Sequence, residues 1–229
     1  MKFDRYNLEA RFLPTIIASL PFFVLYFLNH KLNDFCKFIF SIKIIADISI
    51  SVAFLILLAF IGRAISKDIF ENWWFKSDET KMPTTDFLLY SNSEYSNQFK
   101  NKIHQKVKND FKIKIPSNED ELKNEYNSRK IISEAVSLIR NALKNGRLLL
   151  ERNIEYGFIR NLIGCSVIAV MVSILNIIIF FQITFNHIVL ILSISMTILY
   201  SFPLIFSKIL IKKHGKRYAR TLFQEYIGG

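Results

Sequence analysis

The sequence predicts an all-α membrane protein in which two transmembrane helical hairpins flank a mostly helical cytoplasmic insertion. The chain has 229 residues, 51% of them hydrophobic, and a mean hydropathy of +0.25, which is high for a soluble domain. Its hydrophobic residues gather in four blocks of nearly the length, roughly 20 residues, that a helix needs to cross about 30 Å of hydrocarbon. The four blocks are 12–28, 44–61, 162–183 and 188–207.

The first hairpin is expected within 1–63, with spans 12–28 and 44–61. A buried core helix is the alternative for the first span. A cleaved signal peptide is disfavoured because "LNHKLND", and not a small-residue cleavage site, follows it. The second hairpin is expected within 161–211, and its spans 162–183 and 188–207 contain no Asp, Glu, Lys or Arg. A helical cytoplasmic domain, 64–160, lies between the hairpins, and a basic cytoplasmic tail, 212–229, ends the chain.

The charges predict the topology. The net charge is +11, and 27 of the 30 Lys and Arg residues fall in 1–11, 62–161 and 208–229, which four spans place on one side. The remaining three, Lys31, Lys37 and Lys43, fall in the first loop. By the positive-inside rule, both termini and the central domain are cytoplasmic. Cys36 and Cys165 then lie on opposite faces, so no disulfide between them is expected.

The central domain shows helical patterns in order. "GRAISKDIFENWWF" continues the second span as a helix, and 91–111 is an amphipathic basic helix. "KIKIP" suits a short strand but has no partner strand. Ser117 and Asp120 fit a capping box at the start of the next helix, and Gly146 can end that helix. Residues 147–161 then lead into the third span as one long helix.

Small polar residues recur at helical spacing inside the spans. Such a stripe favours helix packing, because Ser, Thr and Asn give interhelical hydrogen bonds. A water-filled path lined by these groups is the alternative. Asp47 lies about one turn below the outer surface, where it either reaches the headgroups or pairs with Lys43, or, in an oligomer, forms an acidic ring. The candidate pore-lining residues are Asp47, Ser51, Asn176, Ser193, Thr197 and Ser201.

No enzymatic motif is recognisable. The chain has no GxxxxGK[ST], GxGxxG or HExxH motif, and His30, His104, His187 and His214 are isolated from one another. We therefore expect no catalytic residues, no metal site and no cofactor.

The basic helix is the candidate surface for an anionic partner. Anionic lipid on the cytoplasmic leaflet and a nucleotide or oligonucleotide would use the same charges, and the composition does not separate them. Tyr90, Tyr95 and Phe99 are available for stacking on bases. The candidate ligand- or partner-binding residues are Lys100, Lys102, Lys106, Lys108 and Arg160. Duplex DNA is not expected as a partner.

Two stretches, "WWFKSDETKMPTTDFLL" and "ERNIEYGFIRNLIG", resemble signatures of a group of bacterial four-span membrane effectors. In that group a tryptophan precedes a Gly-rich turn and Pro-Thr-Thr, and Asn-x-x-Tyr-Gly-Phe-Arg-Arg-Asn leads into the third span. Lys81 and Met82 stand here in place of the glycines, and Ile159 replaces the first arginine. The resemblance covers about a hundred residues and the span layout. The matching residues are Trp74, Pro83, Thr84, Thr85, Asn153, Tyr156, Gly157, Phe158, Arg160 and Asn161.

These effectors act in anti-phage defence and are encoded beside a nucleotidyltransferase. Within this group, the chain most resembles the membrane (channel) subunits of Hailong systems. The resemblance implies a homo-oligomeric ion channel of the bacterial inner membrane, with a tetramer as one expected assembly, which depolarises the cell. It also implies gating by a nucleotide or oligonucleotide signal, or by the nucleotidyltransferase partner. The alternative from another class is a non-conducting membrane anchor or scaffold that recruits a cytoplasmic partner. A secondary transporter is a third option, but it usually needs more spans or visible inverted repeats.

Overall fold

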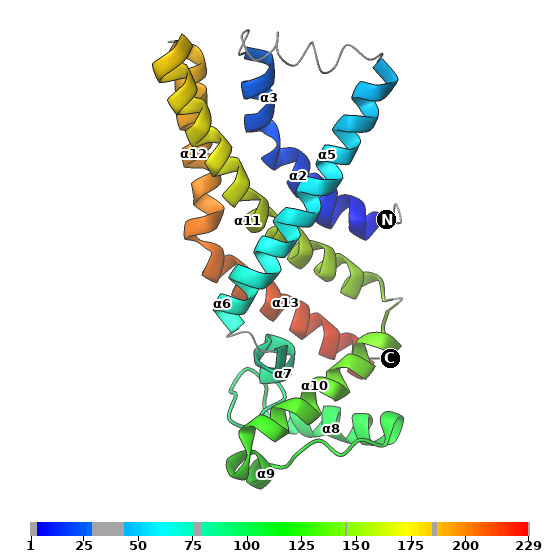
Figure 1. The fold of residues 1–229 in the computed structure, drawn as a ribbon. Helices are drawn as coiled ribbons and strands as arrows, with labels where there is room; N and C mark the ends of the chain where they lie inside the picture. The colour runs from blue at the N-terminus through cyan, green and yellow to red at the C-terminus, as the bar shows by residue number, and fades with distance from the viewer. Residues whose placement is uncertain (1–3, 29–43, 76–78, 145, 185–186, 229) are drawn as a thin grey trace. The chain divides into compact units, whose positions relative to one another are not determined.

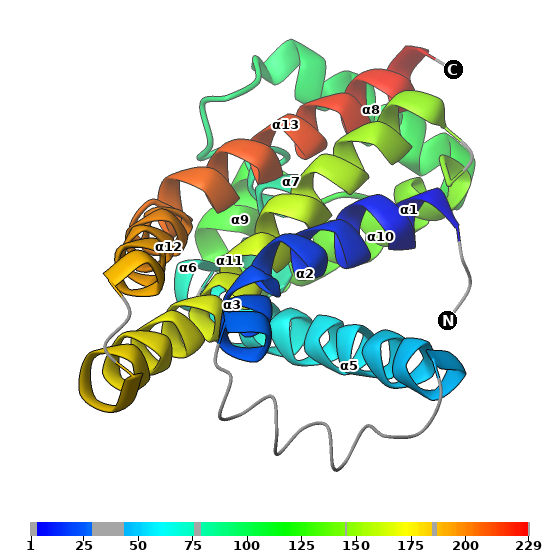
Figure 2. The same ribbon diagram turned by 90° about the horizontal axis from the view of Figure 1, so that it is seen from above.

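The computed structural model describes residues 4–28, 44–75, 79–144, 146–184 and 187–228, and every regular element in these ranges is a helix. The prediction of an all-helical chain is confirmed. The chain forms two compact units (Figures 1 and 2). The first unit consists of Met1–Phe70 and Gly157–Leu210, and the second unit consists of Glu71–Tyr156 and Ile211–Gly229.

The first unit contains the apolar helices. Helices α2 and α3 are separated at Ser19, α2 packs against α5, and α3 packs against α12. The elements with residues in this unit are α1 (Arg5–Asn7), the π-helix η1 (Leu8–Phe12), α2 (Leu13–Ala18), α3 (Leu20–Leu28), α5 (Ile44–Ala64), the π-helix η2 (Ile65–Glu71), α11 (Arg147–Ile179), the π-helix η4 (Phe180–Thr184), α12 (His187–Ile205) and the start of α13 (Ser207–Gly228).

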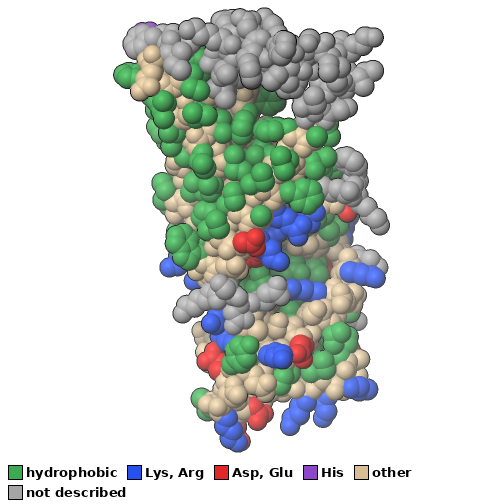
Figure 3. Space-filling view, viewed as in Figure 1, with side chains coloured by type: hydrophobic (Ala, Val, Ile, Leu, Met, Phe, Trp, Pro, Cys, Tyr) green, Lys and Arg blue, Asp and Glu red, His purple; other side chains and the backbone are tan. Residues whose placement is uncertain are grey.

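Two helical segments of the described chain, Arg147–Gln182 and His187–Ile205, are long and apolar enough to cross a membrane. The surface of the first unit is also apolar, because large apolar side chains are exposed on it (Figure 3). Leu57 on α5 is 58% exposed and Ile198 on α12 is 69% exposed. An apolar surface of this extent is unusual on a soluble monomer and is compatible with association with a membrane.

The second unit has a core of its own. Helices α8 (Asn97–Phe111) and α10 (Glu125–Ala142) contribute a buried stripe each, and the turn after α7 (Pro83–Asp86) adds Phe87, Leu88 and Leu89. The remaining elements of this unit are α6 (Asn72–Phe75), the 3-10 helix η3 (Glu79–Lys81), α9 (Asn118–Lys123), the first turns of α11 and most of α13.

Local sequence signals explain several of these boundaries. The capping box of Ser117 and Asp120 is present at the start of α9, as predicted. Residues 112–116, for which a short strand was predicted, belong to no helix or strand. Lys112 is the left-handed C-cap of α8, and Ile115 packs into the core. Residues 212–229 were expected as a tail, but 212–228 belong to helix α13 and bury Leu222 and Phe223 in the core of the second unit.

Candidate functional site

Two prolines interrupt the backbone hydrogen bonds of the first apolar segment. Pro14 and Pro21 carry no N–H. In an α-helical pattern Pro21 leaves the carbonyl group of Ile17, four residues earlier, without its usual donor, whereas Ala10 lies in the π-helix η1, whose hydrogen bonds run over five residues. Side chains of other helices donate to both carbonyl groups. The Asn161 Nδ2 atom donates to the Ala10 oxygen at 2.6 Å, and the Tyr200 hydroxyl donates to the Ile17 oxygen. Such replacement is what lets proline persist in helices that water does not reach.

Helices α5 and α11 approach each other through glycines. A Cβ atom built on Gly164 would lie 2.0 Å from the carbonyl oxygen of Gly62, and one on Gly62 would lie 2.2 Å from the Cys165 sulfur. Gly164 therefore accepts no side chain without separating the helices, whereas a side chain at Gly62 would first displace the side chain of Cys165. Small residues at such a crossing allow the close backbone approach typical of packed membrane helices.

A buried polar group lies beside this crossing. Asn161 is buried, and its Oδ1 atom is 3.4 Å from the hydroxyl of Ser66 on η2, which also donates to the Arg63 carbonyl. Asn161 thus connects α11, the first apolar segment and the end of α5. The sequence placed Asn161 among motif residues but gave it no structural role.

The predicted pore-lining residues divide into two groups. Asn176 and Ser193 are fully buried within one chain, where the Asn176 amide donates to the Pro21 carbonyl at 2.8 Å and Ser193 to Val189 of its own helix. Thr197 and Ser201 are partly exposed and donate to the carbonyl groups four residues earlier. Ser51 is exposed, and the side chain of Asp47 lies outside the described residues. Packing therefore accounts for Asn176 and Ser193, whereas the other described members face outward from the chain.

The predicted ligand-binding residues do not form one site. Lys100 is 1% exposed, and its ammonium group donates to the carbonyl groups of Leu89, at 2.6 Å, and Asn92. The Lys100 ammonium group is thus bound by carbonyl groups inside the second unit. Lys102 and Lys108 are exposed, and Lys106 lies over the Tyr226 ring, 5.1 Å from its centroid. Arg160 belongs to the first unit, whereas the four lysines belong to the second.

The motif residues that the resemblance singled out have definite structural partners. In the second unit, Arg140 donates to Thr84 at 2.8 Å, and Tyr156 donates to Glu71 at 2.5 Å. Gly215 of α13 lies against both Pro83 and Tyr156, with an ideal Cβ 3.4 Å from the Pro83 ring. Thr85 is also buried there, Trp74 and Asn153 are partly buried, and Phe158 is partly buried in the first unit.

Gly157 faces the N-terminal helices of the first unit. A Cβ at this position would lie 3.0 Å from the Cβ of Ala10 and 3.1 Å from the Tyr6 hydroxyl. Together with the bond from Asn161 to the Ala10 carbonyl, this places the second motif stretch directly on the first apolar segment. The motif residues of the first unit are therefore explained by packing.

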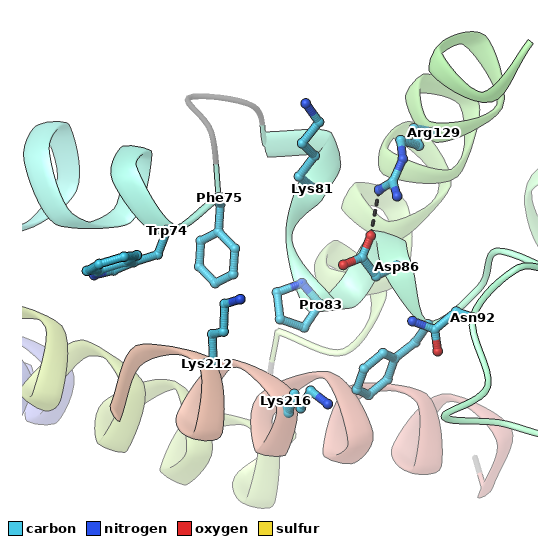
Figure 4. A pocket seen from close by; sticks show the side chains of 10 residues that line it. Trp74, Phe75, Lys81, Pro83, Asp86, Asn92, Arg129, Lys212 and Lys216 are labelled. Carbon is cyan, nitrogen blue, oxygen red and sulfur yellow. Dashed lines mark hydrogen bonds and ion pairs between the residues drawn. The ribbon is translucent and has the colours of Figure 1, made fainter. Parts of the chain in front are cut away.

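A cavity of about 370 Å³ opens in the second unit next to Trp74 (Figure 4). Its size lies in the range, about 300–1,000 Å³, of small-molecule sites. Residues from α6, α7, α10 and α13 surround it, and four of them are basic. The lining residues are Trp74, Phe75, Lys81, Pro83, Asp86, Phe87, Asn92, Arg129, Lys212 and Lys216.

Two groups of ion pairs lie at the walls of this cavity. The Arg129 Nη1 atom lies 2.5 Å from Asp86 and donates to the Thr80 carbonyl, and its Nε atom binds Glu125. On the opposite wall, Lys216 and Arg220 of α13 both bind Glu94, and these hydrogen bonds lower the pKa of the Glu94 carboxyl. Among the lining residues, Asp86 is the single carboxylate. No local sequence pattern indicates this cavity, because its basic residues are spread over the chain from Lys81 to Lys216.

Within the described ranges, no three His, Cys, Asp or Glu side chains gather as ligands of a metal ion would. The chain as a whole matches no protein-family model, no curated protein and no solved structure.

Proposed function

We propose that this chain is an oligomeric membrane effector that forms a gated ion-conducting pore in the bacterial inner membrane and depolarises the cell in anti-phage defence. The observation that carries the proposal is the distribution of side chains in the first unit. Large apolar residues such as Leu57 and Ile198 are exposed, while Asn161, Asn176 and Ser193 are buried. This arrangement suits a hydrocarbon surround, where backbone and side-chain polar groups must be satisfied internally.

The proposed layout has four spans, 12–28, 44–61, 162–183 and 188–207, with both termini and the second unit in the cytoplasm. The two candidate membrane-crossing segments, Arg147–Gln182 and His187–Ile205, support the second hairpin. The charge distribution supports the orientation. In an oligomer, Asp47, the exposed Ser51 and the partly exposed Thr197 and Ser201 would face the axis.

Gating is proposed to follow from a nucleotide or oligonucleotide signal, or from a nucleotidyltransferase partner, acting on the second unit. The excess of basic residues supports an anionic signal. To move a closed state from 99% to 1% of the population, the signal must bind the open state more tightly by roughly 5.5 kcal/mol. Helices α11 and α13, each with residues in both units, are the proposed connection between signal and pore.

A non-conducting anchor that recruits a cytoplasmic partner is the second candidate. It is favoured by the hydroxyl groups of Ser193, Thr197 and Ser201, all of which are satisfied by carbonyl groups of their own helix. Hydroxyls satisfied in this way do not require water or ions beside them.

Current through the purified full chain in a planar bilayer, with and without short oligonucleotides, separates the two candidates. We expect discrete openings whose cation preference falls with Asp47→Asn and is kept with Asp47→Glu, because the second variant retains the charge. Silence under every condition, including with the partner enzyme added, would exclude the pore. Preserved function after both hairpins are replaced by unrelated spans would establish the anchor.

A further inference from the structure

The cavity beside Trp74 is lined mainly by basic side chains. Lys81, Arg129, Lys212 and Lys216 line it, against the single lining carboxylate of Asp86. Arg129 is paired with Asp86 and Glu125, and Lys216 shares Glu94 with Arg220, so Lys81 and Lys212 supply the charge that these carboxylates do not balance. Basic side chains gathered around a hollow raise the local concentration of anions, and lysine acts on phosphate as a mobile point charge. The chemistry of the lining therefore selects an anion.

The basic groups of the cavity have defined positions. Lys212 and Lys216 are one helical turn apart and thus emerge from the same face of α13. Arg129, from α10, is fixed by Asp86, Glu125 and the Thr80 carbonyl. Figure 4 shows the Lys212 side chain between the Trp74 and Phe75 rings on one side and Pro83 on the other.

One wall of the same cavity is apolar and aromatic. Phe75 and Phe87 are buried, and Trp74 is partly buried. Aromatic rings beside basic groups bind the flat or apolar part of a charged ligand by stacking and exclusion of water. A bare inorganic anion would leave this wall unused, so the lining favours an ester in which an anion is joined to a less polar group.

We propose that this cavity binds a phosphate ester, with the phosphate on Lys212, Lys216 and Lys81 and the esterified group against Trp74 and Phe75. A volume of about 370 Å³ fits one such unit and not a folded polymer. A soluble nucleotide and a phospholipid headgroup share this chemistry. The inference deepens the proposed function by giving an anionic signal a site, and it rests on that function only for the effect of binding on current.

Fluorescence of Trp74 can report binding at this site. The chain has two tryptophans; Trp73 is 69% exposed and does not line the cavity, whereas Trp74 does. In the full chain, Trp73→Phe leaves Trp74 as the sole tryptophan. Its emission is followed while the protein in detergent is titrated with adenosine 5′-monophosphate or with inorganic phosphate. In parallel, the protein is reconstituted into nanodiscs of phosphatidylcholine with increasing phosphatidylglycerol.

We expect a saturable change in Trp74 emission in one arm, with inorganic phosphate at least tenfold weaker than the ester. A change with the nucleotide identifies a soluble ligand, and a change that depends on phosphatidylglycerol identifies a headgroup. Lys212→Ala with Lys216→Ala should weaken binding at least tenfold, and arginine at both positions should restore it. Lys213→Ala with Arg217→Ala, exposed positions of α13 that do not line the cavity, is the matched control.

No change in either arm, or equal binding by the Lys212 and Lys216 double alanine variant with unaltered circular dichroism, would overturn the site. Its failure is distinguishable from that of the pore. Saturable binding without any current removes the pore and leaves the site, whereas ligand-dependent current that persists in the double alanine variant removes the site and leaves the pore.

Discussion

The hydroxyl group of Tyr200 on α12 donates a hydrogen bond to the carbonyl oxygen of Ile17, the residue four positions before Pro21. A proline in the first apolar segment is thus matched by a donor that lies 183 positions later in the chain. Tyr200 is almost completely buried, so water does not supply the missing bond. The pairing joins the first apolar segment to the last one.

Removing the Tyr200 hydroxyl group should destabilise the protein, because Pro21 has no N–H to bind the Ile17 carbonyl in its place. Tyr200→Phe is expected to cost about 1 kcal/mol, because the Ile17 carbonyl loses its side-chain donor. Pro21→Ala restores an N–H at the position that normally serves this carbonyl. In the Pro21→Ala background, Tyr200→Phe should therefore cost less than half as much.

The measurement is a double-mutant cycle on unfolding in detergent micelles. Equal costs of Tyr200→Phe in both backgrounds would show that the hydroxyl group serves another purpose than replacing the N–H of residue 21. Ser195→Ala, which removes an exposed hydroxyl bonded within the same helix α12, controls for general effects on that helix.

The glycine crossing between α5 and α11 should not tolerate a methyl group. Gly164→Ala puts a carbon 2.0 Å from the Gly62 carbonyl oxygen, so the helices must separate. We expect a loss of at least about 2 kcal/mol of stability or of most folded protein. Gly215→Ala is the matched control, since its Cβ meets Pro83 at an ordinary 3.4 Å and alanine favours a helix. Comparable yields and melting temperatures for both variants would contradict the tight crossing.

Lys100 should behave as a structural residue and not as a ligand-binding one. Lys100→Met removes the donor to the carbonyl groups of Leu89 and Asn92 and should lower the free energy of unfolding by about 2 kcal/mol. Lys108→Met, on an exposed position of the same helix, should change it by less than 0.5 kcal/mol. Thermal unfolding followed by circular dichroism measures both. A stable Lys100→Met variant with weakened anion binding would return Lys100 to the ligand surface.

The second unit should lose stability as the pH falls from 6.5 to 4. Burial lowers the pKa of His104 from 6.5 to about 4 in the folded protein. Between these values the unfolded chain binds a proton that the folded chain does not, so stability is complete above pH 6.5 and declines toward pH 4. A shift of this size corresponds to up to about 3 kcal/mol.

His104→Gln should remove most of this pH dependence, because glutamine does not titrate. Hydrogen exchange of backbone amides in α8 and α10, recorded between pH 7 and 4 and corrected for the intrinsic rate, reports on this unit. Some loss should remain at lower pH, where Glu94, whose pKa is lowered by Lys216 and Arg220, takes up its proton. An unchanged slope in the glutamine variant would show that another group controls the transition.

The proposed topology predicts opposite outcomes for the two cysteines. A membrane-impermeant maleimide added outside intact spheroplasts should label Cys36, which the four-span layout places in the outer loop. Cys165 is buried against Gly62 and Thr15 and should react only after denaturation. The variants Cys36→Ser and Cys165→Ser assign the signal. Labelling of Cys36 only after the membrane is opened would reverse the orientation.

Sequence patterns sufficed where the cause of structure is local. The capping box at Ser117 and the buried stripe of Ile132, Val136 and Ile139 depend on residues within one or two turns, and both are present. The continuation of residues 147–161 into the third apolar block was likewise visible, as helix α11. The spacing of charges along a single helix was not sufficient to say which lysine is buried, since Lys100 and Lys102 look alike in the sequence.

Long-range pairings were beyond the reach of these patterns. Pro14 and Pro21 signalled interrupted hydrogen bonds, but nothing local indicated that Asn161 and Tyr200 would supply the donors. The cavity combines Trp74, Arg129 and Lys212, which meet only through the packing of α6, α10 and α13. The same packing turns a supposed basic tail into part of the core, although Leu222, Phe223 and Tyr226 already had the spacing of a buried helical face.

The position of α13 has a consequence for how the protein is made. The core of the second unit takes Phe87 through Leu149 from the middle of the chain and Ala219 through Tyr226 from its end. All residues of the second apolar hairpin are translated between these two parts. The ribosome must therefore deliver that hairpin before the second unit can close, so an incomplete chain lacks both a finished core and the Lys212 and Lys216 wall of the cavity. If the proposed site binds an anion, the order of synthesis alone would keep incomplete chains from binding it.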